Sequence, residues 1–71
     1  MHQINPRKLL HSKWTAVTPK NKEKHFLVTK VTYDEEGNVT LCLLEAVLTK
    51  REQAINWQSL KNSDAWQQGW V

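Results

Sequence analysis

Four tryptophans share a chain of 71 residues that has only one cysteine, and this combination constrains the fold most. A domain this small buries only about 60% of the surface that its unfolded chain exposes. Small domains commonly reinforce such a core with disulfides, but Cys42 has no second cysteine to pair with. Each aromatic ring can bury roughly 150–250 Å². We therefore expect tryptophans to stabilise this fold in place of cross-links.

The composition favours one folded domain. Hydrophobic residues make up 39% of the chain and charged residues 24%, both near globular averages. The apolar run at 39–44 is far shorter than the roughly 20 residues that cross a bilayer. No leader with a cleavage site is visible, so we expect a cytoplasmic protein with a reduced thiol. These patterns exclude a membrane span, a disulfide scaffold, a collagen-like fibre and a multidomain enzyme.

Alternating apolar and polar residues predict a mainly β fold, with a small antiparallel sheet of three to four strands. The clearest strand covers residues 25–33, which are rich in β-branched and aromatic side chains. Strict alternation along this strand places Phe26, Val28 and Lys30 on one side. The strand should therefore carry one apolar side and one more polar side.

Residues 39–48 are apolar on both sides and predict a central strand. A hairpin loop over 34–38 joins it to the preceding strand, and Gly37 there can adopt positive φ. A helix over 41–55 is the competing interpretation. Shorter strands are expected at 14–17 and 53–57.

The two ends of the chain differ from its middle. Residues 1–8 are expected to form a flexible basic N-terminal arm, and residues 9–71 a single β domain. Residues 20–24 are polar throughout and predict a mobile basic loop. A short C-terminal helical turn is expected over 64–68, ended by Gly69. The sheet either stays open or curls into a small SH3-like barrel.

Positive charge gathers in the first part of the chain. Residues 1–30 contain seven lysines and arginines against Glu23 alone, whereas 31–71 contain three against six acidic residues. A basic surface of this kind attracts nucleic-acid phosphates or acidic proteins. The residues that we expect to contact a partner are Lys13, Trp14, Lys22, Lys24, Lys30 and Arg51.

The side chains needed for catalysis are poorly placed, so we expect no enzyme, no cofactor and no metal. Cys42 lies within an apolar run and should be a protonated core residue. The three histidines and Cys42 lack the close spacing of zinc ligands; the histidines are His2, His11 and His25. Glu45 interrupts the most apolar strand and should need a cation. The candidates for that cation are Lys13, Lys30 and Arg51.

Several short segments together carry a resemblance to a known family. They are Asn5-Pro6, 9–17, 23–26, 44–48, Lys50-Arg51, 55–57, Leu60 and 66–70. In combination, from about residue 5 to residue 70, they resemble a family of small tryptophan-rich bacterial proteins of unknown function. The resemblance implies a small, free-standing cytoplasmic protein, and it implies no activity, cofactor or substrate.

Three functions fit these observations. The first is a non-catalytic module that binds a protein partner, for which Trp66 and Trp70 with Arg51 could form a patch. The second is single-stranded nucleic-acid (RNA) binding on a basic, aromatic surface. The third is a structural accessory protein. Exposed rings beside lysines favour nucleic acid, exposed rings without lysines favour a protein, and covered rings favour a structural role.

Overall fold

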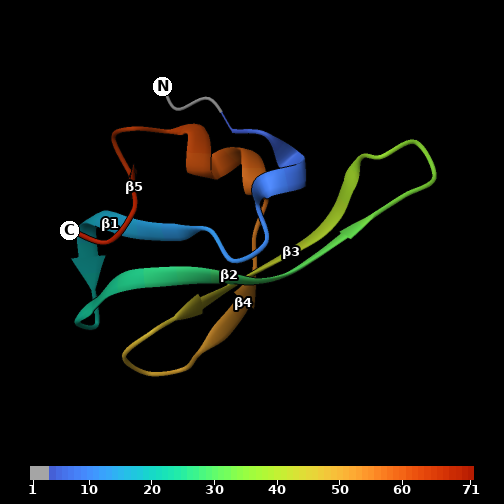
Figure 1. Ribbon diagram of the computed structural model, residues 1–71. Coiled ribbons are helices and arrows are strands. Elements are labelled where there is room, and N and C mark those ends of the chain that lie inside the picture. Colours follow the sequence, from blue (N-terminus) through green and yellow to red (C-terminus); the bar gives the residue numbers. More distant parts are fainter. Residues whose placement is uncertain (1–3) are drawn as a thin grey trace.

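The computed structural model describes residues 4–71, which form one open antiparallel sheet and two short 3-10 helices (Figure 1). The elements are η1 (Pro6–Lys8), β1 (Lys13–Lys20), β2 (Glu23–Tyr33), β3 (Val39–Ala46), β4 (Glu52–Ala54), η2 (Trp57–Lys61) and β5 (Trp66–Gln68). The strand order is β4-β3-β2-β1-β5. The prediction of a mainly β antiparallel fold is confirmed, with five strands instead of three to four.

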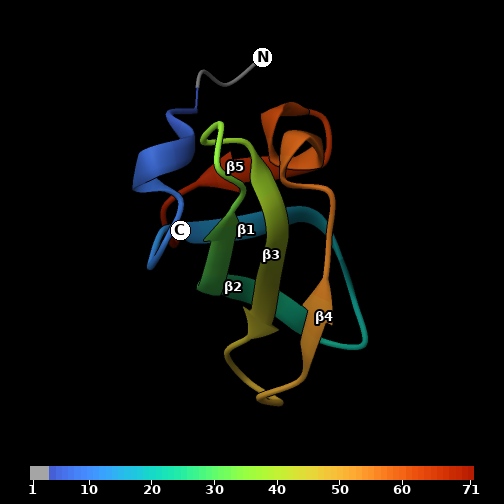
Figure 2. The same ribbon diagram turned by 90° about the vertical axis from the view of Figure 1, so that its right-hand side faces the viewer.

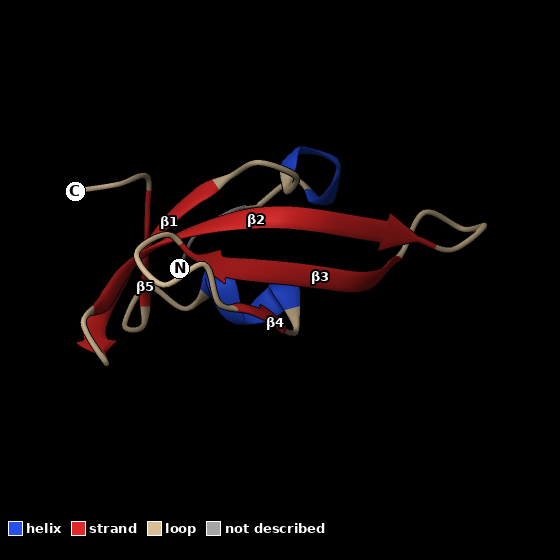
Figure 3. Cartoon of the chain, turned by 90° about the horizontal axis from the view of Figure 1, so that it is seen from below, coloured by secondary structure: helices blue, strands red, loops and turns tan. Residues whose placement is uncertain are grey.

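One face of the sheet carries both 3-10 helices, and the other face carries no helix. Both 3-10 helices lie on the same side of the sheet, and Figure 3 shows β2 and β3 from the opposite side. We call these two sides the inner face and the outer face. In Figure 2, β3 and β4 run nearly upright while β1 crosses behind them, so the sheet bends strongly. Within the described chain, no helix is long and apolar enough to cross a membrane.

The hydrophobic core lies between the inner face and the two 3-10 helices. Its buried residues are Leu9, Trp14, Phe26, Val28, Cys42, Leu44, Ala46 and Leu60. Trp14 is only 1% exposed, and the half-buried Trp57 and Trp66 pack against this core. Three of the four tryptophans thus contribute to the core, and Trp70 is the most exposed of the four.

A bulge in β2 overturns the strict alternation that we expect for this strand. Val28 lies opposite Leu44, but the register shifts before Lys30, which lies opposite Leu43. Because Leu43 and Leu44 are consecutive in β3, they lie on opposite faces. Lys30 therefore lies on the outer face, away from Val28. A bulge inserts one extra residue and reverses the alternation beyond it.

The prediction of a mobile loop over 20–24 is wrong, because β1 and β2 extend to a tight turn between them. Lys20 in β1 lies opposite Glu23 in β2, and only Asn21 and Lys22 connect them. Both connecting residues have positive φ, 55° and 63°, as a two-residue hairpin turn requires. Pro19 is tolerated in β1 because the β1–β2 register is irregular between Thr15 and Lys20.

The predictions of a C-terminal helical turn over 64–68 and of a competing helix over 41–55 are also wrong. Trp66–Gln68 form β5, in which Trp66 lies opposite Ala16 of β1. Residues 41–55 hold most of β3 and all of β4, joined by a turn. The 3-10 helix η2 begins after Asn56, whose side chain accepts a hydrogen bond from the backbone N–H of Gln58. This Asn cap, rather than one near residue 63, starts the helical turn.

The N-terminal segment is partly packed on the domain. Ile4 packs against the core, Leu9 is fully buried, and η1 lies between them. The side chain of Asn5 caps η1 through the backbone N–H of Arg7. Residues 1–3 of the expected arm lie outside the described residues. The division into an arm and a domain stays a prediction.

Candidate functional site

The register places a row of four side chains across the outer face. Lys13 in β1 lies opposite Leu27 in β2, which lies opposite Glu45 in β3, and Glu45 lies opposite Glu52 in β4. The neighbours of this row along β1, β2 and β3, such as Trp14, belong to the core. By the same register, the outer face includes Lys13, Thr15, His25, Leu27, Lys30, Thr32, Leu41, Leu43, Glu45, Glu52, Ala54 and Gln67.

The outer face has an apolar centre between opposite charges. Leu27, Leu41 and Leu43 are half-buried although no helix covers them. The cations of Lys13 and Lys30 lie on β1 and β2, and the carboxylates lie on β3 and β4. An apolar centre with a charged rim is the usual anatomy of a protein interface.

Local contacts hold both carboxylates of the outer face. Lys50 Nζ lies 3.9 Å from Glu45 Oε1, and Thr29 Oγ1 donates a 2.7 Å hydrogen bond to Glu52 Oε2. Glu45 is paired with Lys50 and with none of the three cations expected for it. Lys13 lies two strands away on β1 and Lys30 lies opposite Leu43, so Lys50 in the turn after β3 is the cation that reaches Glu45.

The C-terminal segment 69–71 is fixed against β1 and β2. Thr15 Oγ1 donates to the carbonyl oxygen of Gly69 at 2.6 Å and accepts from the backbone N–H of Val71 at 3.3 Å. His25 Nε2 donates to the Val71 carbonyl oxygen at 2.8 Å. Thr15 is only 2% exposed as a result. These bonds hold the intervening residue, Trp70, at one end of the outer face.

Trp70 is an exposed ring with a fixed position. Its Nε1–H donates to the carbonyl oxygen of Phe26 at 2.9 Å. Lys13 Nζ lies 4.8 Å from the ring centroid, and the His25 ring is tilted at 54° with its centroid 6.1 Å away. The side chain remains 43% exposed. Trp70 can therefore offer an aromatic surface to a ligand without further ordering.

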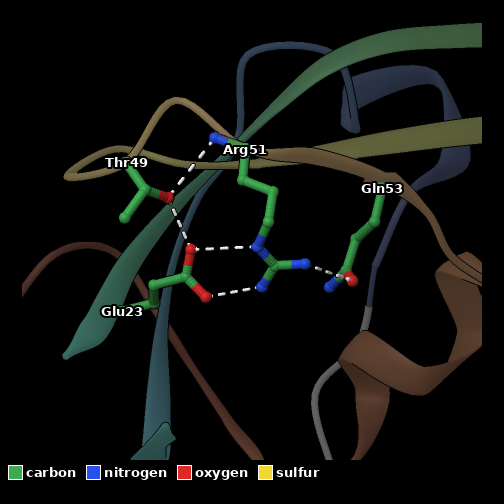
Figure 4. A network of polar contacts seen from close by, with 4 residues as sticks. All are labelled: Glu23, Thr49, Arg51 and Gln53. Atoms are coloured by element: carbon green, nitrogen blue, oxygen red, sulfur yellow. Dashed lines mark hydrogen bonds and ion pairs between the residues drawn. The ribbon is translucent and has the colours of Figure 1, made fainter. Parts of the chain in front are cut away.

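A buried carboxylate joins the β1–β2 hairpin to the turn before β4 (Figure 4). Glu23 is 4% exposed and accepts two hydrogen bonds from Arg51, one of them 3.2 Å from Nε, and a third from Thr49 Oγ1. Arg51 also donates from Nη1 to Gln53 at 3.2 Å. The hydrogen bonds from Arg51 and then Thr49 lower the pKa of Glu23. Arg51 therefore stabilises the fold.

A groove of about 520 Å³ lies beside this ion pair, on the side opposite the outer face row. The ends of β1 and β2, the start of β4 and the turn before β5 contribute its walls. Its lining residues are Ala16, Thr18, Lys20, Asn21, Glu23, Phe26, Arg51, Gln53, Asp64, Ala65 and Trp66. The cations of Lys20 and Arg51 balance the carboxylates of Glu23 and Asp64, so the groove lining carries no net charge.

The structure separates the six expected contact residues. Lys13 and Lys30 share the outer face, whereas Lys22 and Lys24 are exposed at and beside the hairpin turn. The Trp14 ring is buried and its Nε1–H bonds Ser12 Oγ at 2.9 Å, so we remove it from the contact set. We also remove Arg51, because Glu23 and Gln53 engage its guanidinium.

Sequence reasoning missed two parts of this surface. The leucines Leu27 and Leu43 were visible as alternate residues of predicted strands, but no pattern showed which side a helix would leave uncovered. Trp70 was expected to form a patch with Trp66 and Arg51. In the structure Trp66 packs edge-to-face on Phe26 at 5.1 Å, away from Trp70.

Cys42 is expected to react slowly in the folded protein. Its thiol is buried in the core, and this burial raises its pKa. A thiol reagent at neutral pH should modify native protein at least about a hundredfold more slowly than urea-unfolded protein, because the thiolate forms only after opening. Absorbance of the released thiolate measures both rates. Equal rates would overturn the core placement.

Within residues 4–71, no three histidine, cysteine or acidic side chains gather as a metal site would require. His2 lies outside the described residues.

The family comparison agrees with the resemblance seen in the sequence. A family model described as Tryptophan-rich protein (DUF2389) matches residues 12–71, which include every described strand. No curated protein and no solved structure matches the chain.

Proposed function

We propose that this chain, which belongs to the tryptophan-rich protein family DUF2389, is a non-catalytic module that binds a protein partner through its outer face. One observation carries the proposal: a sheet face that no helix covers combines half-buried leucines with a charged rim. Trp70 adds an exposed aromatic side chain at one end of that face. Tryptophan is enriched among residues that dominate binding energy.

We also propose the finer architecture, a small SH3-like barrel whose wall is left open. The order β4-β3-β2-β1-β5 and the strong bend of the sheet support it. The helix η2 also supports it, because η2 connects the two edge strands, β4 and β5, along the chain. Such a scaffold can present binding residues on a rigid sheet. The single buried thiol is compatible with the cytoplasm, where we propose that the protein acts.

The charges of this face favour a protein over a nucleic acid as the partner. Single-stranded nucleic acid is bound by positively charged grooves with stacking rings. The outer face carries Glu45 and Glu52 as well as Lys13 and Lys30, so its charges are balanced. A balanced face repels phosphates at β3 and β4 and suits a protein of mixed charge.

Affinity capture from cell extract tests the proposal with matched variants. Leu43→Glu places a charge at the centre of the outer face, and Ala54→Glu does so at an exposed position of the same face. Leu10→Glu is the control, because Leu10 is 45% exposed but precedes β1. We expect one stoichiometric protein with wild type and Leu10→Glu, and its loss with both outer-face variants. Recovery of no protein, or retention by both outer-face variants, contradicts the proposal.

Single-stranded nucleic acid is the second candidate, because Trp70 is an exposed ring beside a lysine. Lys61 stacks on Trp57 at the same 4.8 Å distance in η2, which makes Lys61→Ala a matched control for Lys13→Ala. Filter binding of a labelled oligonucleotide at about 50 mM and 200 mM salt separates the candidates. We expect no retention. Salt-sensitive retention that Lys13→Ala reduces and Lys61→Ala does not would favour nucleic acid.

A further inference from the structure

We propose that an extended peptide segment of a protein partner adds to the sheet as a further strand beside β4, with every second side chain in the groove next to Glu23 and Arg51. This site is separate from the outer face, so the inference goes beyond the proposed function. β4 and β5 are the edge strands of the sheet, and both line the groove, through Gln53 and Trp66. The groove therefore lies between the two edges of the sheet.

The backbone of β4 has hydrogen-bonding groups that point away from β3. Arg51 and Ile55, which flank β4, bond residues of β3 through their backbone groups, each at 2.9 Å. Such bonds occur at every second residue of an antiparallel strand, so Gln53 also faces β3, and the backbone groups of Glu52 and Ala54 point away from it. All three residues of β4 are exposed. An added strand can therefore bond this edge, as in other cases of peptide recognition by strand addition.

The groove gives the added strand a place for its side chains. Successive side chains of a strand point to opposite faces, and Gln53 lines the groove whereas its neighbours in β4 lie on the outer face. Every second side chain of a strand beside β4 therefore points to the groove side as well. Phe26 and Trp66 form an apolar wall there, with their rings edge-to-face at 5.1 Å. An apolar side chain in the middle of the added segment fits this wall.

Two charges of the groove set the charge order of the ligand. Lys20 and Asp64 are exposed and line the groove, and neither forms an ion pair within the part of the chain that the structure describes. Lys20 lies opposite Glu23, which bonds Arg51 just before β4, so Lys20 marks the start of β4. Asp64 lines a second hollow with residues of η2, which follows β4. A strand antiparallel to β4 therefore carries a basic residue, then an apolar one, then an acidic one.

Selection from a random library of twelve-residue peptides on the immobilised full chain tests this ligand class. We expect enrichment of peptides with a basic, an apolar and an acidic residue at every second position, in that order. The double variant Lys20→Glu, Asp64→Lys should enrich the opposite charge order. Lys22→Glu is the control and should enrich the wild-type order, because Lys22 is exposed at the hairpin turn but is not part of the groove lining. No enrichment, or a charge order that the double variant leaves unchanged, overturns the proposal.

Titration calorimetry with the most enriched peptide tests the strand addition itself. Ala54→Pro removes an N–H that the added strand would use, and proline is tolerated in an edge strand where the N–H faces solvent. We expect this variant to raise the dissociation constant at least about tenfold, whereas Ala54→Ser, which keeps the N–H, should leave it unchanged. Bound peptide should also slow hydrogen exchange at the Glu52 and Ala54 amides. Equal dissociation constants for the two variants, or amides that exchange as fast as before, contradict the inference.

An outer-face variant separates this inference from the proposed function. Leu43→Glu lies at the centre of the outer face and should leave the dissociation constant of the peptide unchanged. Peptide binding that Leu43→Glu abolishes and Ala54→Pro retains would place the peptide on the outer face and overturn the groove site. Capture of a partner by the outer face decides the proposed function independently of the peptide.

Discussion

Replacing Trp14 with alanine is expected to lower the free energy of unfolding by about 3–5 kcal/mol, the usual effect of removing a buried tryptophan. The ring is 1% exposed, and its Nε1–H is satisfied by Ser12, so the whole side chain contributes to the core. A domain of this size has a total of roughly 4–10 kcal/mol. Urea unfolding followed by far-UV circular dichroism should show a variant that is marginally folded or unfolded in buffer.

Trp70→Ala is the matched control, because it removes the same ring from a position that is 43% exposed. This variant loses the hydrogen bond to Phe26 and the contact with Lys13, and we expect its free energy of unfolding to fall by under about 2 kcal/mol. Equal urea midpoints for the two variants would refute the view that buried indole rings replace cross-links here.

Much of the fold follows from the pattern of apolar residues. The hairpin of β2 and β3 was predictable because alternating side chains and Gly37, with a φ of 85°, agree on the same turn. The burial of Cys42 was predictable because it lies in an apolar run. These features depend on local sequence, where a pattern is sufficient.

The remaining features depend on contacts between distant residues. Lys30 reached the outer face through a bulge whose position is set by pairing with β3. β5 is only three residues long and becomes a strand because β1 pairs with it. The outer face itself is defined by where η1 and η2 pack, which no periodicity within the strands shows. The candidate site was therefore only partly predictable, through Lys13 and Lys30.

The buried ion pair is the clearest case of a missed long-range contact. Glu23 was counted only as the single acid among seven cations, yet it is 4% exposed and bonds Arg51 and Thr49, both far along the chain. A buried carboxylate requires partners, but sequence separation of 28 residues hides which ones. Arg51 was consequently expected to contact a partner.

Glu23→Gln is expected to lower stability at pH 7 and to weaken its dependence on pH. In the folded protein the hydrogen bonds from Arg51 and Thr49 hold the Glu23 pKa below its ordinary value of about 4.3. The unfolded chain therefore binds the proton more readily, and stability rises with pH. The contribution of Glu23 is fully present above about pH 5 and is lost as pH falls through the lowered folded pKa. The free energies of unfolding of wild type and variant should consequently become equal in acid.

Urea midpoints measured between pH 7 and pH 3 check this expectation. Asp34 also has a lowered pKa, chiefly through the backbone N–H of Asn38, and it contributes the same acid-sensitive slope to both proteins. The difference between the two curves therefore isolates Glu23. Glu45→Gln is the control, since Glu45 meets Lys50 at 3.9 Å on the surface, where an ion pair contributes little. A Glu23→Gln curve parallel to that of wild type would show that the charge of Glu23 does not stabilise the fold.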